Sequence, residues 1–194
     1  VVVQQAAYAL VHNLLGSLPP EWATCLNGPG EDMKRVGSAA CALVQGFASF
    51  LPAAVYQEPL FESPATSGLD LDLARAGSLG WQDGDTVAGR VAGAFWDLTE
   101  FDPTQDGSDR FNATFKDIWQ VIDAKRPTTM AQWWAGWKAL GKDACSAVGS
   151  LAQNTINYNS DPMVVPGNLR IEMDEDTTRS VDLWAGSAYV EKLT

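Results

Sequence analysis

The chain has 194 residues, of which 46% are hydrophobic and only 19% are charged, so it can bury a sizeable core and is not disordered throughout. Its 13 Lys and Arg residues against 24 Asp and Glu residues give a formal net charge of -11 at pH 7. This charge repels phosphate backbones, which excludes nucleic acid as a partner. We find no apolar run long enough to cross a bilayer and no signal peptide, and therefore expect no membrane span.

Helical spacing of apolar residues organises the first half of the chain. The segment 2–15 is predicted to be a helix, and because it begins without a capping residue we expect further residues upstream. A second helix is predicted from Ser38, a capping residue, to about Tyr56. The stretch 58–84 is rich in Pro, Gly, Ser and Asp, and is predicted to be irregular or only briefly helical. A third helix is predicted to begin near Asp85, whose carboxylate would cap it, and its small residues allow close helix packing.

Three further helices are predicted in the second half. Residues 111–122 have helical spacing, and Pro127 ends that segment. Either Thr128 or Thr129 is predicted to cap the next helix, and the last helix runs over about 142–157.

The pattern changes after residue 160, where the segments 169–173 and 180–184 alternate like two short strands. Such strands cannot stand alone in water, so they must pack on the body, on another domain or on another chain. We therefore predict a mainly α fold, with a helical domain over residues 1–158. Residues 159–194 are predicted to be a linker and β-strand tail, either the start of a following β domain or a strand between subunits.

Five short segments, which occur in the same order, resemble the gluzincin-like zinc metallopeptidases of secreted bacterial proteins. They are Val2–Tyr8, Cys41–Phe50, Val87–Leu98, Phe115–Trp119 and Trp133–Trp137. The first stands where that family has His-Glu-x-Gly-His after an apolar pair, and the second where it has Cys-Ala-x-x-Glu-Gly-Phe-Ala-Asp-Phe. The resemblance spans roughly residues 1–158 and implies the helical C-terminal lobe of such a peptidase.

The resemblance also implies where a zinc site would lie. In that family two histidines at i and i+4 and a glutamate from a second helix bind zinc, and the glutamate after the first histidine is the general base. Here the ligand positions hold Gln4, Tyr8 and Gln45, the base position holds Gln5, and Ser49 stands where the family often has a supporting acid. Glutamine is a weak neutral ligand that cannot accept a proton, and a phenol with a pKa near ~10 is a poor substitute for imidazole. We expect neither catalysis nor bound zinc, unless the family chemistry is retained.

Three cysteines permit one disulfide, and we predict that Cys25 pairs with Cys41, which leaves Cys145 as a thiol. The sequon at Asn112 is a candidate glycosylation site and fits a secreted protein.

Two polar features are candidate ligand sites. Asp102, Asp106 and Asp109 supply hard oxygens at a spacing that could hold calcium, but the glutamate of an EF-hand is absent, and we favour an ordinary solvated loop. His12 is the only histidine in the chain, and we favour a packed or half-exposed side chain over a metal ligand.

Eight tryptophans raise the alternative of sugar stacking. We predict core positions for Trp96, Trp119, Trp133 and Trp137, and better exposure for Trp22 and Trp81.

Together these observations favour a non-catalytic, metallopeptidase-like pseudoenzyme domain that is secreted and acts as an extracellular binding or assembly module. Its partner would be a protein or peptide, including copies of itself joined through the C-terminal tail. The first alternative is an active zinc-dependent peptidase, if the motif positions are really His and Glu. The second is a glycan-binding module.

Overall fold

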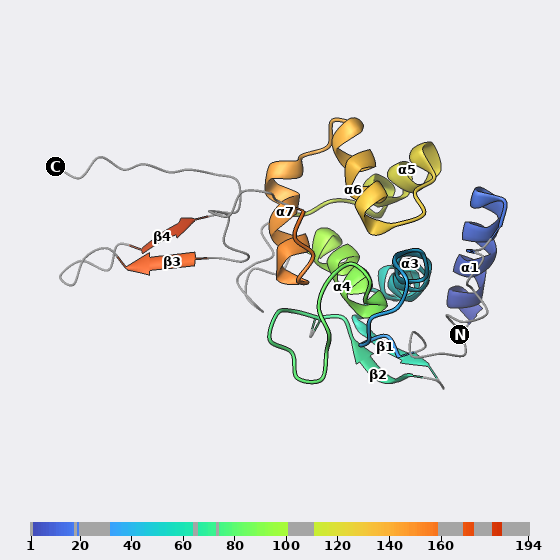
Figure 1. The fold of residues 1–194 in the computed structure, drawn as a ribbon, viewed down its shortest axis with the longest axis horizontal. Coiled ribbons are helices and arrows are strands. Elements are labelled where there is room, and N and C mark those ends of the chain that lie inside the picture. Colours follow the sequence, from blue (N-terminus) through green and yellow to red (C-terminus); the bar gives the residue numbers. More distant parts are fainter. Residues whose placement is uncertain are drawn as a thin grey trace.

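The computed structural model describes residues 2–17, 19, 32–63, 66–72, 74–100, 111–158, 169–172 and 180–183. This part of the chain is mainly helical, as predicted (Figure 1). Its helices are α1 (Val2–Leu15), α3 (Ala39–Tyr56), α4 (Ala88–Thr99), α5 (Phe115–Lys125), α6 (Met130–Ala139) and α7 (Ala144–Gln153). Its strands are β1 (Leu60–Ser63), β2 (Thr66–Asp70), β3 (Leu169–Glu172) and β4 (Ser180–Leu183).

The first two helices have the predicted limits. α1 spans Val2–Leu15, and Gly16 follows it with a φ of 77°, a left-handed conformation that glycine adopts without strain. α3 begins after Ser38, whose hydroxyl accepts a hydrogen bond from the backbone N–H of Cys41 at 3.1 Å. A local capping signal is therefore sufficient to place the start of α3.

α3 and α4 pack closely at the centre of the fold (Figure 1). A Cβ placed on Gly46 of α3 would lie 2.7 Å from the Val91 side chain of α4, so only glycine allows this approach. An aromatic cluster extends the core: the ring centroids of Phe47 and Phe95 lie 6.3 Å apart, and those of Phe95 and Trp133 lie 5.0 Å apart. The glycines of α4, which were predicted to allow close packing, face other segments than α3: a Cβ on Gly89 would meet Trp81 and Met33, and one on Gly93 would meet Asn154 and Ala74.

One expectation about α3 is wrong. Its 18 residues, Ala39–Tyr56, are long and apolar enough by length and composition to cross a membrane, contrary to the expectation that the chain holds no such run. Gln45, Ser49 and Pro52 interrupt the apolar residues. The segment therefore counts as apolar by its mean hydropathy and not as an unbroken run of apolar residues. In the fold, 67% of this segment is buried, and core helices of soluble proteins pass the same test.

The start of α4 also differs from the prediction. Val87, rather than Asp85, is the N-cap residue, and it makes no side-chain capping bond. The Asp85 carboxylate instead accepts a hydrogen bond from the Tyr158 hydroxyl at 2.8 Å. The carbonyl of Met33 accepts from the backbone N–H of Gly89 at 2.8 Å, so a segment distant in sequence satisfies part of the helix end.

The stretch 58–84, predicted to lack regular structure apart from a brief helix, contains an antiparallel hairpin. β1 pairs with β2 through Leu60 opposite Asp70 and Phe61 opposite Leu69, with an irregularity before the turn. Past this hairpin the chain is held to α4 by Arg90, whose side chain is 0% exposed. Its guanidinium donates to the backbone carbonyls of Gln82 and Arg75 at 3.0 and 2.5 Å. These two hydrogen bonds hold the loop between β2 and α4, which has no regular secondary structure, against α4.

The last three helices are each capped by a side chain. Thr114 and Asp117 form a capping box at the start of α5, Thr129 accepts from the backbone N–H of Gln132 at the start of α6, and Asp143 caps α7. Of the two residues predicted to cap this helix, Thr129 is the N-cap residue and Thr128 is not. α5 begins at Phe115 rather than near residue 111, and α7 covers less of the chain than the predicted 142–157.

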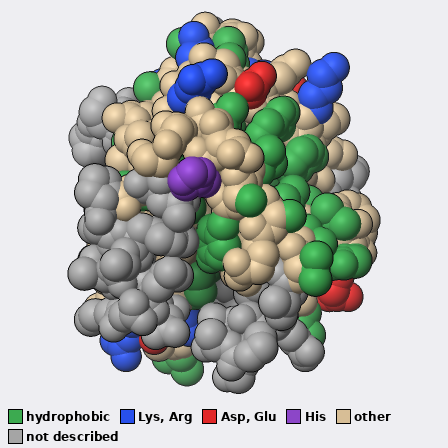
Figure 2. All heavy atoms as spheres, turned by 90° about the vertical axis from the view of Figure 1, so that its right-hand side faces the viewer, with side chains coloured by type: hydrophobic (Ala, Val, Ile, Leu, Met, Phe, Trp, Pro, Cys, Tyr) green, Lys and Arg blue, Asp and Glu red, His purple; other side chains and the backbone are tan. Residues whose placement is uncertain are grey.

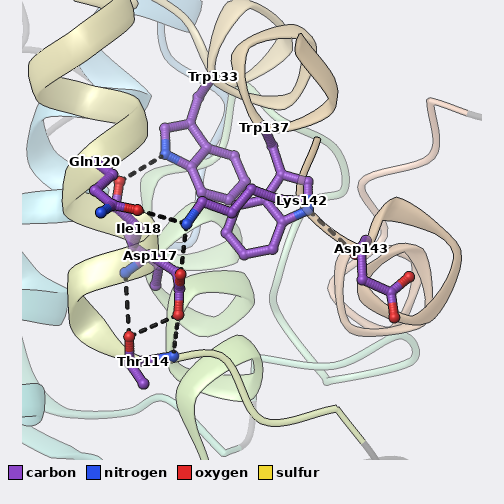
Figure 3. Close-up of polar contacts among 8 residues, drawn as sticks. All are labelled: Thr114, Asp117, Ile118, Gln120, Trp133, Trp137, Lys142 and Asp143. Carbon is purple, nitrogen blue, oxygen red and sulfur yellow. Dashed lines mark hydrogen bonds and ion pairs between the residues drawn. The ribbon is translucent and has the colours of Figure 1, made fainter. Parts of the chain in front are cut away.

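Lys142 connects α5 with the loop before α7 (Figure 3). Its ammonium donates to Asp117 Oδ1 at 2.5 Å and to Gln120 Oε1 at 2.6 Å. The hydrogen bond from Lys142, with those of Thr114, lowers the pKa of Asp117 to about 2. The carboxylate is therefore charged at neutral pH and holds both its helix cap and the lysine.

The two predicted strands of the tail are present as β3 and β4. They pair antiparallel, with Leu169 opposite Leu183 and Glu172 opposite Ser180. The sheet that they form has two strands, in the order β3-β4. The division of the chain at residues 158 and 159 stays a prediction.

Candidate functional site

The positions singled out by the resemblance lie on α1 and α3, which pack against each other (Figure 1). Gln4 and Tyr8 are one helical turn apart on α1, and Gln4 Nε2 donates to the Tyr8 hydroxyl at 3.4 Å. Gln5, at the position of the general base, is exposed. The i and i+4 pair that would face a metal in the family is here linked by a hydrogen bond between an amide and a phenol.

Burial determines the chemistry of Tyr8. Desolvation raises its pKa to about 12, against a smaller lowering by the hydrogen bond from Gln4. The phenol is therefore protonated at neutral pH. A protonated phenol carries no charge with which to balance a divalent cation.

Gln45 lies in the first half of α3 and is 5% exposed, which makes it one of the buried polar residues of the fold. Ser49, one turn later, is 0% exposed, and its hydroxyl donates to Met33 Sδ at 4.0 Å. Both positions are held inside the protein by the packing of α3. A charged glutamate at position 45 would need a cation or hydrogen-bond donors to offset its burial, whereas a neutral amide needs only hydrogen bonds.

His12 lies in the last turn of α1 and is exposed, more so than the packed or half-exposed side chain expected from the sequence (Figure 2). In the part of the chain that the structure describes, no group of three or more His, Cys, Asp and Glu side chains is placed to hold a metal ion. Asp102, Asp106 and Asp109 lie outside the described residues, so the calcium alternative stays a prediction.

The structure describes only some of the residues in the disulfide and glycosylation predictions. Cys145 is exposed and is not disulfide-bonded, and Cys41 is 3% exposed. Cys25 lies outside the described residues, and its pairing with Cys41 stays a prediction. Asn112 is exposed, just before the capping residue Thr114 of α5, and its glycosylation also stays a prediction.

The tryptophans of the helices are mostly core residues, as predicted. Trp96, Trp133 and Trp137 are 6%, 0% and 1% exposed, while Trp119 is only partly buried. Trp81 is also partly buried, because Gly89 leaves room for its ring: a Cβ there would lie 2.5 Å from Trp81 Cζ3. The Arg90 guanidinium lies 5.2 Å from the centroid of the Trp81 ring. Trp81 is thus packed into the fold rather than displayed as an open platform, and Trp22 lies outside the described residues.

A pocket of about 670 Å³ lies elsewhere, where three helix ends meet. The carboxyl ends of α3 and α4 and the amino end of α5 form its wall. Its lining residues are Ala54, Gln57, Pro59, Trp96, Thr99, Glu100, Asn112, Ala113, Thr114 and Phe115. Sequence reasoning missed this site because the lining residues come from three segments and form no motif. Asn112, Trp96 and Phe115 had drawn attention, but each for another reason.

Comparison with models of known protein families shows to which family the chain belongs. A family model described as the mycolysin C-terminal domain matches residues 1–159. The chain belongs to this family. Searches of curated proteins and of solved structures found no match.

Membership of the mycolysin C-terminal domain family supports the coarser part of the resemblance, a C-terminal domain related to secreted bacterial metallopeptidases. The match does not test the four motif positions. In this mycolysin C-terminal domain those positions hold an amide pair, a phenol and a buried amide.

Proposed function

We propose that this chain is a non-catalytic, metallopeptidase-like domain that acts outside the cell as a binding or assembly module. The observation that carries the proposal is the set of side chains at the family's zinc and base positions, which are Gln4, Gln5, Tyr8 and Gln45. None of them is an imidazole or a carboxylate. The family membership supports a peptidase-associated domain, and these residues support the loss of its chemistry.

Physical chemistry argues against a working zinc site at these positions. Three neutral ligands leave the charge of Zn²⁺ uncompensated, and burial, which raises the pKa of Tyr8 to about 12, makes its phenolate harder to form. Gln5 has no group that accepts a proton at neutral pH, so water could not be activated even if a metal were present.

An extracellular location is supported by the family, and the disulfide that we propose would suit it. Cys145 is not disulfide-bonded, so the disulfide that we propose joins Cys41 with Cys25, the remaining cysteine of the chain. Disulfides persist in oxidising surroundings such as the outside of a cell. Titration of the denatured protein should find one thiol before reduction and three after it, and three thiols before reduction would contradict the proposed pairing.

The assembly part of the proposal rests on β3 and β4, which form a sheet of two strands. Each strand of such a sheet has one edge whose backbone groups are not used within the pair, and these edges can pair with a strand of another chain. Analytical ultracentrifugation of the full chain should show concentration-dependent association, with slower amide exchange in both strands on association. A monomer at all concentrations would remove the assembly role and leave the binding role.

Metal analysis tests the loss of catalysis directly. We expect the purified protein to hold far less than one zinc ion per chain and to show no zinc-dependent peptidase activity. Stoichiometric zinc in the unaltered protein would overturn the proposal and favour the active peptidase.

Two designed variants sharpen this test. One carries Gln4→His, Tyr8→His and Gln45→Glu, which restores the ligands, and the other adds Gln5→Glu, which restores the base. We expect both to bind zinc and to be stabilised by it, because the carboxylate introduced at the buried position 45 then has a cation to compensate its charge. Only the second would have the group needed to activate water. Failure of both to bind zinc would show that the helices do not bring these positions together.

A further inference from the structure

The positive charges of the chain are concentrated on α5, α6 and the loops beside them. Residues 114–143, which form this part, carry five basic and three acidic residues, whereas residues 1–113 carry five basic and fourteen acidic residues. Figure 2 shows Lys and Arg side chains over the upper part of the molecule, where Figure 1 places α5 and α6. These two helices therefore have a positive balance within a chain whose net charge is -11.

Several of these cations are not neutralised within the fold. Asp117 Oδ1 accepts a hydrogen bond from Lys142 Nζ at 2.5 Å, so these two opposite charges satisfy each other. None of the ion pairs in the described part of the chain involves Lys116, Lys125 or Arg126. All three of these side chains are exposed, so their charges are open to a partner.

Lys125 and Arg126, which we call the basic corner, lie where α5 ends and the chain turns toward α6. A Cβ placed on Gly136 of α6 would lie 2.9 Å from Lys125 Cγ, so the stem of this lysine packs on α6 while the exposed side chain keeps its ammonium in water. Arg126 is the C-cap residue of α5. The backbone N–H and the hydroxyl of Thr128 both donate to Gln132 Oε1, at 2.8 and 2.9 Å, and hold the turn that follows. A fixed backbone thus presents two adjacent cations, which lowers the ordering cost of a contact.

Self-association places a specific demand on a chain with this charge. Two copies, each with a net charge of -11, repel each other, so a stable contact between them must bring unlike charges together. Residues 159–194 carry seven acidic and three basic residues, and Asp174–Asp176, between β3 and β4, is the longest acidic run of the sequence. β3 and β4 lie beyond α7, on the side away from α5 (Figure 1). This arrangement favours the basic corner of a second copy over that of the same chain.

We propose that the basic corner binds the acidic run Asp174–Asp176 of a second copy of this chain. The guanidinium of Arg126 can donate two parallel hydrogen bonds to one carboxylate, and Lys125 supplies a cation for the next. The inference deepens the proposed assembly function, on which it rests, by naming the surface that receives the tail. Pairing of strand edges uses backbone groups of β3 and β4, whereas this contact uses carboxylates between the strands, so one contact does not exclude the other.

An exchange of charges between two variants of the full chain tests this contact. The corner variant carries Lys125→Glu and Arg126→Glu, and the tail variant carries Asp174→Lys and Glu175→Lys. Glutamate keeps the Cβ and Cγ with which position 125 packs on Gly136, and circular dichroism verifies that both variants fold. In analytical ultracentrifugation at low ionic strength, each variant alone should associate about tenfold more weakly than the unaltered chain.

The equimolar mixture of the two variants carries the decisive expectation. It should form complexes that contain one copy of each variant, because the acidic corner of one then meets the basic tail of the other. Association of the unaltered chain should also weaken as salt is added, because salt screens exposed charges.

Arg35→Glu with Arg75→Glu is the matched control for the corner variant. Both arginines are exposed and lie outside α5 and α6, and the double substitution makes the same change in net charge. It should weaken association far less than the corner variant does. An equal loss in both would reduce the attraction to general charge and overturn the inference.

Two further results would also overturn it. One is a mixture that stays as monomeric as its two components, because restored unlike charges would then fail to join the copies. The other is a corner variant that associates as strongly as the unaltered chain, in which case the copies still assemble and only the receiving surface is wrong. Loss of the assembly role itself has a different signature, since the unaltered chain would then be a monomer at every concentration and the inference would end with it.

Discussion

The packing of α4 against the end of α7 gives the most demanding test of the fold. A Cβ added at Gly93 would lie 2.3 Å from Asn154 Oδ1 and 2.4 Å from Ala74 Cβ, whereas real Cβ contacts essentially never fall below 3.0 Å. Asn154 is 0% exposed, and its amide nitrogen donates to Asp97 Oδ2 at 2.5 Å and to the Ser150 carbonyl at 3.0 Å. Gly93→Ala must therefore separate the helices or break these bonds.

The expected cost follows from three contributions. Overpacking of a tight contact costs roughly 1–3 kcal/mol, loss of a buried hydrogen bond costs about 1 kcal/mol or more, and alanine recovers about 1 kcal/mol of helix propensity. We expect Gly93→Ala to lower the free energy of unfolding by roughly 1–3 kcal/mol. Gly149 of α7 is the matched control, because a Cβ there meets nothing within 4 Å. Gly149→Ala should raise the free energy of unfolding by about 1 kcal/mol.

Urea denaturation followed by tryptophan fluorescence measures both changes. With a slope of roughly 2 kcal/mol per molar urea, the midpoints of the two variants should differ by roughly 1–2 M. If Gly93→Ala unfolds at the same urea concentration as the unaltered chain, or at a higher one, then close packing at this position does not stabilise the fold and the reasoning is refuted.

Three further substitutions probe polar contacts, each by denaturation of the purified variant. Arg90→Met should destabilise the chain by about 3 kcal/mol, because it leaves two loop carbonyls without their donor; a loss below about 1 kcal/mol would contradict that role. Lys142→Met should cost about 1 kcal/mol at pH 7 after allowance for solvent screening. Because the pKa of Asp117 is lowered from 3.8 to about 2, this contribution is present above pH 4 and is lost as the pH falls through about 2, so the cost should shrink there. Thr129→Ala should cost about 1 kcal/mol by removing the cap of α6, and an unchanged midpoint would show that the cap is dispensable.

Local signals predicted several elements well. α1 and α3 have the expected limits because the stop at Gly16 and the cap at Ser38 act within a few residues. The β3 and β4 strands also appear where alternation placed them. In each case the deciding interaction lies close in sequence, so the pattern of residues is sufficient.

Failures occurred where distant segments compete with local preference. Asp85 has the right chemistry for a cap, but Tyr158, distant in sequence, uses its carboxylate, and Met33 satisfies an amide of α4 instead. The hairpin of β1 and β2 was hidden in a stretch of Pro, Gly and Ser, where composition favours loops and only pairing between strands reveals the sheet.

The candidate sites divide in the same way. The residue types at the four motif positions are readable from the sequence, since an amide cannot become a carboxylate in any fold. The burial of Tyr8, which raises its pKa from 10.0 to about 12, required the structure. The pocket also required the structure, because its lining residues come from three segments.

The sequence by itself determined the helical class, the capping of α3, the strand-forming tail and the neutral character of the motif positions, because these depend on residue type and on neighbours within about one helical turn. Tertiary structure decided which helices approach at Gly46 and Gly93, which loop Arg90 holds, and that three helix ends enclose a pocket. Such features depend on contacts between segments far apart along the chain, and no local pattern records the distance between them.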